Sequence, residues 1–469
     1  MLFSSPVFLF LFLPLVLIAS LVAGRRLRPW LLLLASLFFY FWGEGNSLLL
    51  LLLMVAATWG FTRWIERTTS PRGRGWVLAV ALAFQLGFLA WLKYLAPTSA
   101  LFSAPLRALG LAAGKDGCVP TPMGVSFFTF MAITTVVSVS RREAAASRSP
   151  LPVALQLALF PQVTSGPIVT WRQFAPQASA LRPDLESFAA GVERFIVGLA
   201  KKVLLAVPLG RVADQAFAAP AGTLPAACAW LGLLCYTGQI FLDFSGYTDM
   251  AVGLGRMLGY RLPENFNLPY AARTVKEFWT RWHMSLTNLL REYVFMPVAF
   301  AVSGRIRGDR LLGARAESWA YHLATAATML LCGVWHGAAW TFVAWGAFHA
   351  LALSAEQWVG AKRLRRWPGA LVHGWTLLVV MAGWVFFRAP SLGGAARYFA
   401  SLVGSGTADP AIDWRLWLAP DVTLCLGIGA LVALIRWQRV GAMLSRPLAV
   451  PVVRWLGDVA RIILLCGTF

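Results

Sequence analysis

The sequence predicts an all-α, polytopic membrane protein, because of its composition and its pattern of apolar runs. Only 13% of the 469 residues are charged, and the mean hydropathy is +0.66. Soluble domains carry about 25% charged residues, so the composition excludes a water-soluble fold. Apolar runs of spanning length recur along the chain. We therefore expect roughly ten to twelve transmembrane helices, together with re-entrant or interfacial segments.

Residues 1–140 are predicted to form regular crossings. Leu2–Ala23 is apolar from the outset and lacks a small-residue cleavage site, so we expect a retained helix rather than a signal peptide. The further apolar runs are Trp30–Trp42, Leu48–Phe61, Trp76–Leu95 and Val119–Val139. Basic clusters at 25–28, 63–74 and 141–148 follow every second crossing, which places those loops in the cytoplasm and the N-terminus outside.

The middle of the chain, residues 150–355, is less regular. Leu151–Val163 is too short to cross a bilayer, and Pro161 and Pro167 interrupt it. Broken backbone at membrane depth is tolerated only where protein buries it or a water-filled cavity solvates it. We therefore expect this segment to be re-entrant or interfacial.

We expect three further segments of the middle region to differ in how they meet the membrane. Leu224–Phe244 is predicted to span, and Tyr247–Tyr260 is predicted as a separate short segment after a break. Phe278–Phe300 mixes aromatic and charged residues, which suits a helix near the cytoplasmic surface or beside a cavity. The C-terminal part returns to regular spans: Tyr321–Trp335, Ala338–Leu353, Leu371–Phe387, Val422–Ile435 and Val450–Leu465.

The formal net charge of +21 raises the possibility of a nucleic-acid binder. Its Lys and Arg residues instead form short clusters between apolar runs, as the positive-inside rule predicts. Part of the excess is also available to an anionic ligand or to anionic lipids. The six cysteines are scattered and show neither CxxC nor Cys/His spacing. We therefore predict no metal site and no disulfide framework.

One titratable side chain, His336, lies between two strongly apolar runs, Ala324–Leu331 and Phe342–Leu353. An ionisable group at membrane depth is costly unless it is paired or faces a water-filled cavity, so it is a candidate functional residue. Gly333 and Gly337 remove side-chain bulk around it, which lets a ligand or another backbone approach. The alternative is a buried histidine that bonds to a neighbouring carbonyl.

A second histidine follows a pair of opposite charges. Glu277 and Arg281 are four residues apart, in the order that favours an ion pair on a helix. His283 lies 53 positions before His336, so any contact between them has to come from the fold. The alternative is a solvated interfacial helix whose tryptophans anchor it among lipid headgroups.

Two other groups of polar residues suggest more ordinary roles. Asp243 and Asp249 are six residues apart, on different faces of a helix, so we expect a polar network at a helix break rather than an acid–base pair. Basic residues near His283 can pair with phosphates of an acyl donor, although the positive-inside rule accounts for most of them. These are Lys276, Arg281, Arg291, Arg305 and Arg307.

Residues 334–342, Val-Trp-His-Gly-Ala-Ala-Trp-Thr-Phe, resemble the active-site signature of membrane-bound O-acyltransferases. The closest branch in these motifs is the bacterial alginate O-acetylation branch. Further segments similar to that branch occur in order along the chain, at 1–10, 160–168, 198–202, 243–247 and 263–286. The resemblance therefore extends over most of the chain and implies one membrane-embedded domain, with N-terminal helices (1–140), a catalytic region (150–355) and C-terminal helices (370–469).

The resemblance implies acetyl transfer from cytoplasmic acetyl-CoA, with no bound cofactor and no metal. His336 would be the general base, and His283 would orient or polarise the donor. Leu151–Ile168 and Asp243–Tyr260 would line a passage between the two faces of the membrane. The candidate substrate-binding residues are Trp335, Trp340, Trp282, Arg281, Lys276, Asn265 and Asp243.

The resemblance also implies a location and partners. The chain would lie in the bacterial inner membrane and pass the acetyl group to a periplasmic acetyltransferase of the SGNH type, whose serine delivers it to an alginate-like exopolysaccharide. One departure concerns substrate identity. The family's Trp-Leu-Arg-Asp-Tyr run and Pro-Leu-Gly-Gly are replaced at 289–293 and 297–300 by Leu-Leu-Arg-Glu-Tyr and Pro-Val-Ala-Phe, which is expected to reshape a loop beside the donor site.

Other functions remain open at this point. Within the same reaction class they are D-alanyl transfer to teichoic acid and acyl transfer to peptidoglycan or a glycolipid. A transporter with a structural histidine would move substrate without cleaving a thioester, and no internal repeat of the transporter kind is visible. A membrane scaffold would make replacement of His336 silent.

Overall fold

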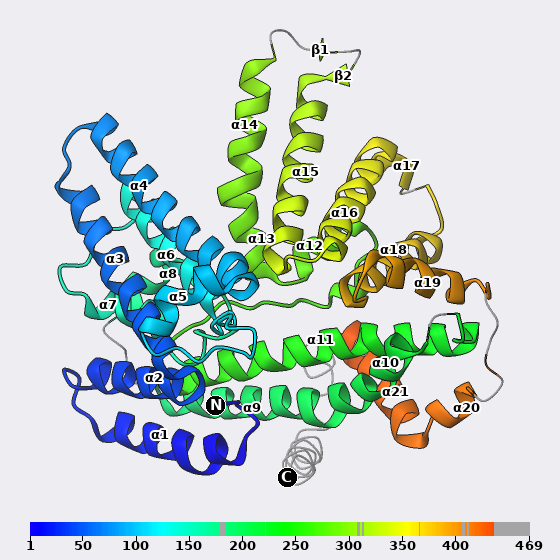
Figure 1. Ribbon diagram of the computed structural model, residues 1–469, viewed down its shortest axis with the longest axis horizontal. Coiled ribbons are helices and arrows are strands. Elements are labelled where there is room, and N and C mark those ends of the chain that lie inside the picture. The colour runs from blue at the N-terminus through cyan, green and yellow to red at the C-terminus, as the bar shows by residue number, and fades with distance from the viewer. Residues whose placement is uncertain are drawn as a thin grey trace, which may run out of the picture. The chain divides into compact units, whose positions relative to one another are not determined.

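The computed structural model describes residues 1–178, 183–220, 222–306, 310–311, 314–364, 366–405, 409 and 412–435. The chain forms two compact units. Figure 1 shows the helices of both. Unit 1 comprises Met1–Leu199 and Tyr247–Pro263, and unit 2 comprises Ala200–Gly246 and Glu264–Phe469. The described residues are overwhelmingly helical, which confirms the predicted all-α class.

Unit 1 is built around one almost wholly buried helix. Its helices are α1 (Leu13–Val22), α2 (Arg28–Glu44), α3 (Leu48–Arg67), α4 (Pro71–Ala90), α5 (Ala100–Ala108), α6 (Val125–Ser140), α7 (Leu151–Ala158), α8 (Trp171–Phe174) and α9 (Leu185–Ala200). Helix α6 packs against both α3 and α4, and nearly all of its side chains are buried. Its apolar residues on every face explain why it lies inside the unit.

The predicted broken segment is present in unit 1. Helix α7 has only eight residues, and the chain from Leu159 to Val169 is mostly buried without forming a helix. Gln156 satisfies one carbonyl of this irregular backbone, because its Nε2 donates a hydrogen bond to the carbonyl of Val169 at 3.0 Å. Gln162 Nε2 in turn donates to the carbonyl of Gln156 at 2.5 Å. Protein groups therefore satisfy the broken backbone where water is excluded.

The break predicted after Leu224–Phe244 does not exist. Helix α11 runs without interruption over Ala226–Met257 and continues from unit 2 into unit 1. The two carboxylates that suggested a break are neutralised by ion pairs instead. Lys202 Nζ lies 2.5 Å from Asp243 Oδ1 in unit 2, and Arg194 Nη2 lies 2.7 Å from Asp249 Oδ1 in unit 1. Paired charges can remain on a buried helix, so the prediction of separate segments, one of them beginning at Asp243, was wrong.

Unit 2 contains the long hairpin of α15 and α16. Its helices are α10 (Val207–Ala218), α12 (Val275–Arg281), α13 (Met284–Leu290), α14 (Met296–Arg305), α15 (Ala316–His336), α16 (Trp340–Val359), α17 (Ala361–Leu364), α18 (Gly369–Arg388), α19 (Leu392–Leu402), α20 (Trp414–Trp417) and α21 (Pro420–Leu434). Two-residue strands β1 (Arg310–Leu311) and β2 (Ala314–Arg315) pair antiparallel, with Arg310 opposite Arg315. Gly333 and Gly346 bring α15 and α16 into backbone contact near their junction.

The prediction of one helix over Phe278–Phe300 was also wrong. The chain leaves the helix after Arg281 and forms α13, a π-helical turn over Arg291–Phe295 and then α14. His283 lies at the break with φ +43°, a left-handed conformation that side chains with a Cβ rarely adopt. Residues 296–305, where a reshaped loop was expected, are helical. The predicted span Val450–Leu465 lies outside the described residues.

Several helices are long and apolar enough to cross a membrane. Within the described part of the chain they are Arg28–Arg67, Pro71–Thr98, Ala226–Met257 and Gly369–Arg388, and Phe8–Val22, Val125–Ser140 and Pro420–Leu434 are shorter apolar helices. The chain is therefore a multi-pass membrane protein, and the count of ten to twelve crossings stays a prediction.

The contact between α9 and α11 in unit 1 gives a test of the fold. A Cβ on Gly253 would lie 2.5 Å from the carbonyl oxygen of Gly191 and 2.7 Å from the amide of Phe195. We expect Gly253→Ala to destabilise the protein by about 1–3 kcal/mol through overpacking. Gly87→Ala on α4 is the control, because nothing lies within 4 Å of its added Cβ. Thermal unfolding in detergent measures both, and equal melting temperatures would contradict this packing.

Candidate functional site

The break between α12 and α13 is closed by an extended segment that precedes α12. The amide of Met284 donates to the carbonyl of Asn265 at 2.9 Å, and the amide of Asn267 donates to the carbonyl of Arg281 at 3.0 Å. These two bonds satisfy backbone groups on both sides of the break. They also fix His283 at the centre of the break, where its side chain is only 4% exposed.

The side chain of Asn265 determines which nitrogen of His283 carries the proton. Asn265 Oδ1 lies 3.1 Å from the amide nitrogen of Ser285, 2.9 Å from Ser285 Oγ and 3.0 Å from His283 Nδ1. A backbone N–H can only donate, so the atom facing Ser285 must be the amide oxygen and not the NH2 group. His283 Nδ1 therefore donates a hydrogen bond to the same oxygen and carries a proton.

His283 Nε2 is consequently a hydrogen-bond acceptor. Burial disfavours the charged imidazolium and lowers the pKa of His283 below its usual range, so the ring is neutral at physiological pH. In the neutral ring with Nδ1 protonated, Nε2 has a free lone pair. This atom is buried and has no hydrogen-bond partner among the residues that the structure describes. A buried lone pair of this kind is costly unless a ligand or water uses it.

His336 lies at the C-terminal end of α15 and is half-buried. Its ring makes edge-to-face contacts with Trp345 at 5.2 Å and with Phe387 at 4.9 Å between ring centroids. The Trp335 ring lies between the two histidines, 4.5 Å from the centroid of His336 and 6.5 Å from that of His283. The fold thus brings both predicted catalytic residues to one indole ring, despite their separation in the chain.

Two of the predicted substrate-binding residues belong to this cluster with Trp335. Asn265 holds His283, as described above. Trp282 is buried and packs on Trp384 at 4.9 Å and on Phe266 at 5.0 Å. Asn265 Nδ2 is buried without a hydrogen-bond partner among the described residues, whereas the contacts of Trp282 are with aromatic rings.

The other predicted residues lie elsewhere or are already paired. The Trp340 side chain is 73% exposed, and Lys276 is exposed with its Nζ 5.8 Å from the Tyr321 ring. The predicted helical ion pair is confirmed, because Arg281 Nη2 lies 2.6 Å from Glu277 Oε1. Asp243 is bound to Lys202, and Arg307 lies outside the described residues. Among the residues that are described, no three His, Cys, Asp or Glu side chains are placed to hold a metal ion.

Several aromatic residues of the site were not predicted. Phe244 packs edge-to-face on His283 at 4.8 Å, and Phe387 does the same on His336. Trp345 connects His336 to His349, which is fully buried and lies 5.2 Å from Trp345 between ring centroids. Two of them carried a signal in the sequence, because Trp345 follows the histidine motif and Phe244 lies in the family-like segment 243–247. The others come from distant segments and are identified only by the fold.

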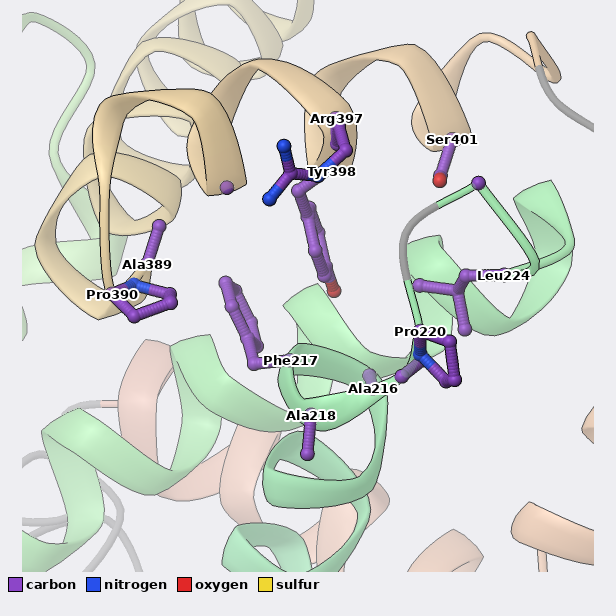
Figure 2. Close-up of a pocket in the computed structure, with 13 residues that line it drawn as sticks. Ala216, Phe217, Ala218, Pro220, Leu224, Ala389, Pro390, Arg397, Tyr398 and Ser401 are labelled. Carbon is purple, nitrogen blue, oxygen red and sulfur yellow. The ribbon is translucent and has the colours of Figure 1, made fainter.

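A pocket opens in unit 2 between the end of α10, the residues that follow α18, and α19 (Figure 2). Its volume is about 300 Å³, at the lower end of the range for ligand pockets. Phe217 and Tyr398 stack at 4.1 Å in its wall. Arg397 and Pro390 also line it, and Pro390 is three residues beyond Phe387.

Comparisons with known proteins agree with the resemblance noted in the sequence. The model of the membrane-bound O-acyltransferase family matches residues 34–387. A probable alginate O-acetylase of Azotobacter vinelandii is 36% identical over 422 residues, which cover 89% of this chain and 79% of that protein. A peptidoglycan O-acetyltransferase of Helicobacter pylori is 32% identical over 60% of this chain and 57% of its own length. A teichoic acid D-alanyltransferase of Bacillus subtilis is 29% identical over 50% and 60%.

The role of the Asn265 side chain can be tested by two substitutions. Asn265→Ala leaves three donors without their acceptor, and we expect it to destabilise the protein by about 2–4 kcal/mol. Asn265→Asp keeps an acceptor oxygen and should be less destabilising. Its carboxylate would favour the imidazolium and raise the pKa of His283, so the neutral ring would be lost as pH falls through the raised pKa.

Thermal unfolding and the NMR titration of His283 measure these two effects. Ser285→Ala is the control that removes only one of the three donors. Equal stability of all three variants, or an unshifted His283 titration in Asn265→Asp, would contradict this account of the hydrogen bonds.

Proposed function

The chain belongs to the membrane-bound O-acyltransferase family and is a multi-pass membrane acyltransferase, and from this premise we propose that it takes an acetyl group from cytoplasmic acetyl-CoA. The acetyl group is passed to an acceptor on the far side of the bacterial inner membrane. The observation that carries this proposal is the placement of His283 and His336 on one indole ring. Basic clusters at the chain's loops support the orientation with the donor in the cytoplasm.

In the proposed reaction His336 is the general base. It takes the proton of the acceptor hydroxyl as the oxygen attacks the carbonyl carbon of the thioester. The tetrahedral intermediate then collapses, the carbon–sulfur bond breaks, and the CoA thiolate leaves and takes up the proton from the imidazolium. An imidazole can accept a proton in the first step and return it in the second, so a histidine suits both steps. The half-buried position of His336 is consistent with access for an acceptor.

His283 has a different role in this proposal. Its free nitrogen, Nε2, can accept a hydrogen bond but cannot donate one while the ring is neutral. It therefore cannot polarise the thioester carbonyl. It can orient the donor by accepting from an N–H group, and the pantetheine arm of CoA carries two amides of this kind. Of the two roles that the sequence suggested for His283, orientation of the donor is the one compatible with this tautomer.

The acceptor that we propose is the serine of a periplasmic SGNH-type acetyltransferase, which delivers the acetyl group to an alginate-like exopolysaccharide. The similarity to probable alginate O-acetylases over 89% of the chain supports this choice. The peptidoglycan and teichoic acid enzymes match only 60% and 50% of the chain. Acetyl transfer to peptidoglycan and D-alanyl transfer are therefore the weaker alternatives, and transport without thioester cleavage is a further one.

Release of free CoA thiol from acetyl-CoA tests the proposal directly. We expect purified wild-type protein to release thiol when the periplasmic partner is present. His336→Ala should lower the rate by about 10²–10⁴-fold, the usual contribution of a positioned general base. His322→Ala is the matched control, because His322 lies on the same helix and, in the described part of the chain, its aromatic neighbour is Tyr321.

The outcome separates the alternatives. An active His336→Ala protein that remains monodisperse on size exclusion would remove His336 from the reaction. Thiol release with D-alanyl carrier protein and not with acetyl-CoA would assign the D-alanyl reaction. Movement of acetyl-CoA or acetate into proteoliposomes without thiol release would identify a transporter.

A further inference from the structure

A second pocket of about 280 Å³ lies in unit 1 and contains none of the residues used by the proposed reaction. It is formed by the C-terminal end of α3, the start of α4 and the chain that follows α6. Its lining residues are Ile65, Glu66, Arg74, Val139, Arg142, Ala144, Ala145 and Ala146. Its apolar lining residues are Ile65, Val139 and three alanines, and its charged ones are Arg74, Arg142 and Glu66.

The acidic residues at this end of unit 1 are already paired with other arginines. Glu66, which lines the pocket, forms an ion pair with Arg63. Glu143 lies 3.7 Å from Arg141 and 3.8 Å from Arg172, as measured between their nearest charged atoms. Arg74 and Arg142 have no ion pair among the residues that the structure describes. The pocket therefore contains two uncompensated positive charges.

Arg142 occupies a position that normally belongs to glycine. The amide of Arg142 donates to the carbonyl of Val139 at 3.1 Å, and the amide of Glu143 donates to that of Ser138 at 2.9 Å. This pair of bonds is the Schellman motif that ends a helix, and its left-handed residue is usually glycine. Arg142 takes that conformation with φ +60°. Such backbone strain suggests that the side chain is kept for another purpose.

Arg74 is also placed unfavourably. It lies in the first turn of α4, where the helix dipole repels positive charge, and no acidic residue occupies that turn. Arg72 lies in the same turn but does not line the pocket, whereas Arg74 and Arg142 both line it. Such conflicts are expected where a ligand supplies the missing interaction. An anion between Arg74 and Arg142 would relieve the charge at both positions.

We propose that this pocket binds the phosphate group of an anionic ligand, with Arg74 and Arg142 as its two cationic contacts. Arginine binds phosphate oxygens through paired N–H donors, and the apolar lining residues accommodate a less polar part of the ligand. The phosphate belongs either to an anionic phospholipid or to a soluble phosphate compound. The positive-inside pattern places these loops at the cytoplasmic surface, where both are present. The proposal is independent of the acyl-transfer reaction.

The test measures thermal unfolding by the fluorescence of the 22 tryptophans, with the full-length protein purified in a neutral maltoside detergent. Phosphatidylglycerol, phosphatidylcholine and inorganic phosphate are added separately. We expect the melting temperature of the wild type to rise saturably, by about 2–5 °C, with phosphatidylglycerol or phosphate and not with phosphatidylcholine. A response to inorganic phosphate that abolishes the lipid response would identify a soluble ligand.

Two substitutions should lose this response. Arg142→Gly removes the charge and also relieves the backbone strain, so we expect its melting temperature without ligand to equal or exceed the wild-type value by up to about 3 °C. Arg74→Gln should lose the response without that gain. A variant that is more stable alone and yet unresponsive to ligand cannot be explained by misfolding.

The matched controls are Arg141→Gly and Arg72→Gln. Each control also removes one arginine charge, at a position one or two residues from the tested arginine. Neither Arg141 nor Arg72 lines the pocket. Arg141 has φ −78°, so its replacement by glycine relieves no strain. Both controls should keep the full response. If Arg74→Gln and Arg142→Gly respond to phosphatidylglycerol as these controls do, the attraction is a general property of the basic surface and the proposed site is wrong.

Discussion

Inside a bilayer, a break in a helix frees backbone N–H and C=O groups that no water can pair. Two breaks in this chain are closed by side chains and neighbouring backbone. In unit 1, Gln156 bonds to the carbonyl of Val169 where the chain leaves α7. In unit 2, Asn265 closes the break between α12 and α13 through both its carbonyl groups. Gln156 lies in α7 directly before its break, whereas Asn265 lies 18 residues before His283, so only the second break is closed by a distant segment.

The bond that closes the second break also determines the chemistry available there. Asn265 Oδ1 is held in place by Ser285, whose backbone N–H has no alternative but to donate. The proton of His283 is therefore fixed on Nδ1, and the lone pair of Nε2 is left buried beside Phe244. A neutral acceptor at His283 and a more exposed imidazole at His336, both next to Trp335, suit the separate tasks proposed for the two histidines. Asn265 Oδ1 therefore both closes the chain break, by accepting from Ser285, and fixes the tautomer of His283.

The sequence predicted the all-α class, the break at the tip of the α15–α16 hairpin and the Glu277–Arg281 ion pair, because each depends on residues that are close in the chain. It failed where partners are distant. Asp243 suggested a helix break, since nothing in the local sequence reveals that Lys202 pairs with it. The contact of Phe387 with His336 was invisible for the same reason. Resemblance to a family identified the histidines, whereas their tautomer and their neighbours required coordinates.

The environment of the two histidines also bears on why a membrane site suits this reaction. An acetyl thioester in reach of water can be hydrolysed, so a transferase gains when it excludes water from the reacting carbon. His283 is almost fully buried, and Trp335 and Phe244 contact its ring. His336 is less buried and contacts the residue that precedes the pocket of Figure 2. A donor held near His283 would be protected from water, while an acceptor hydroxyl could still approach His336. In the proposed reaction, this difference in exposure would place the donor at the buried His283 and the acceptor at the half-buried His336.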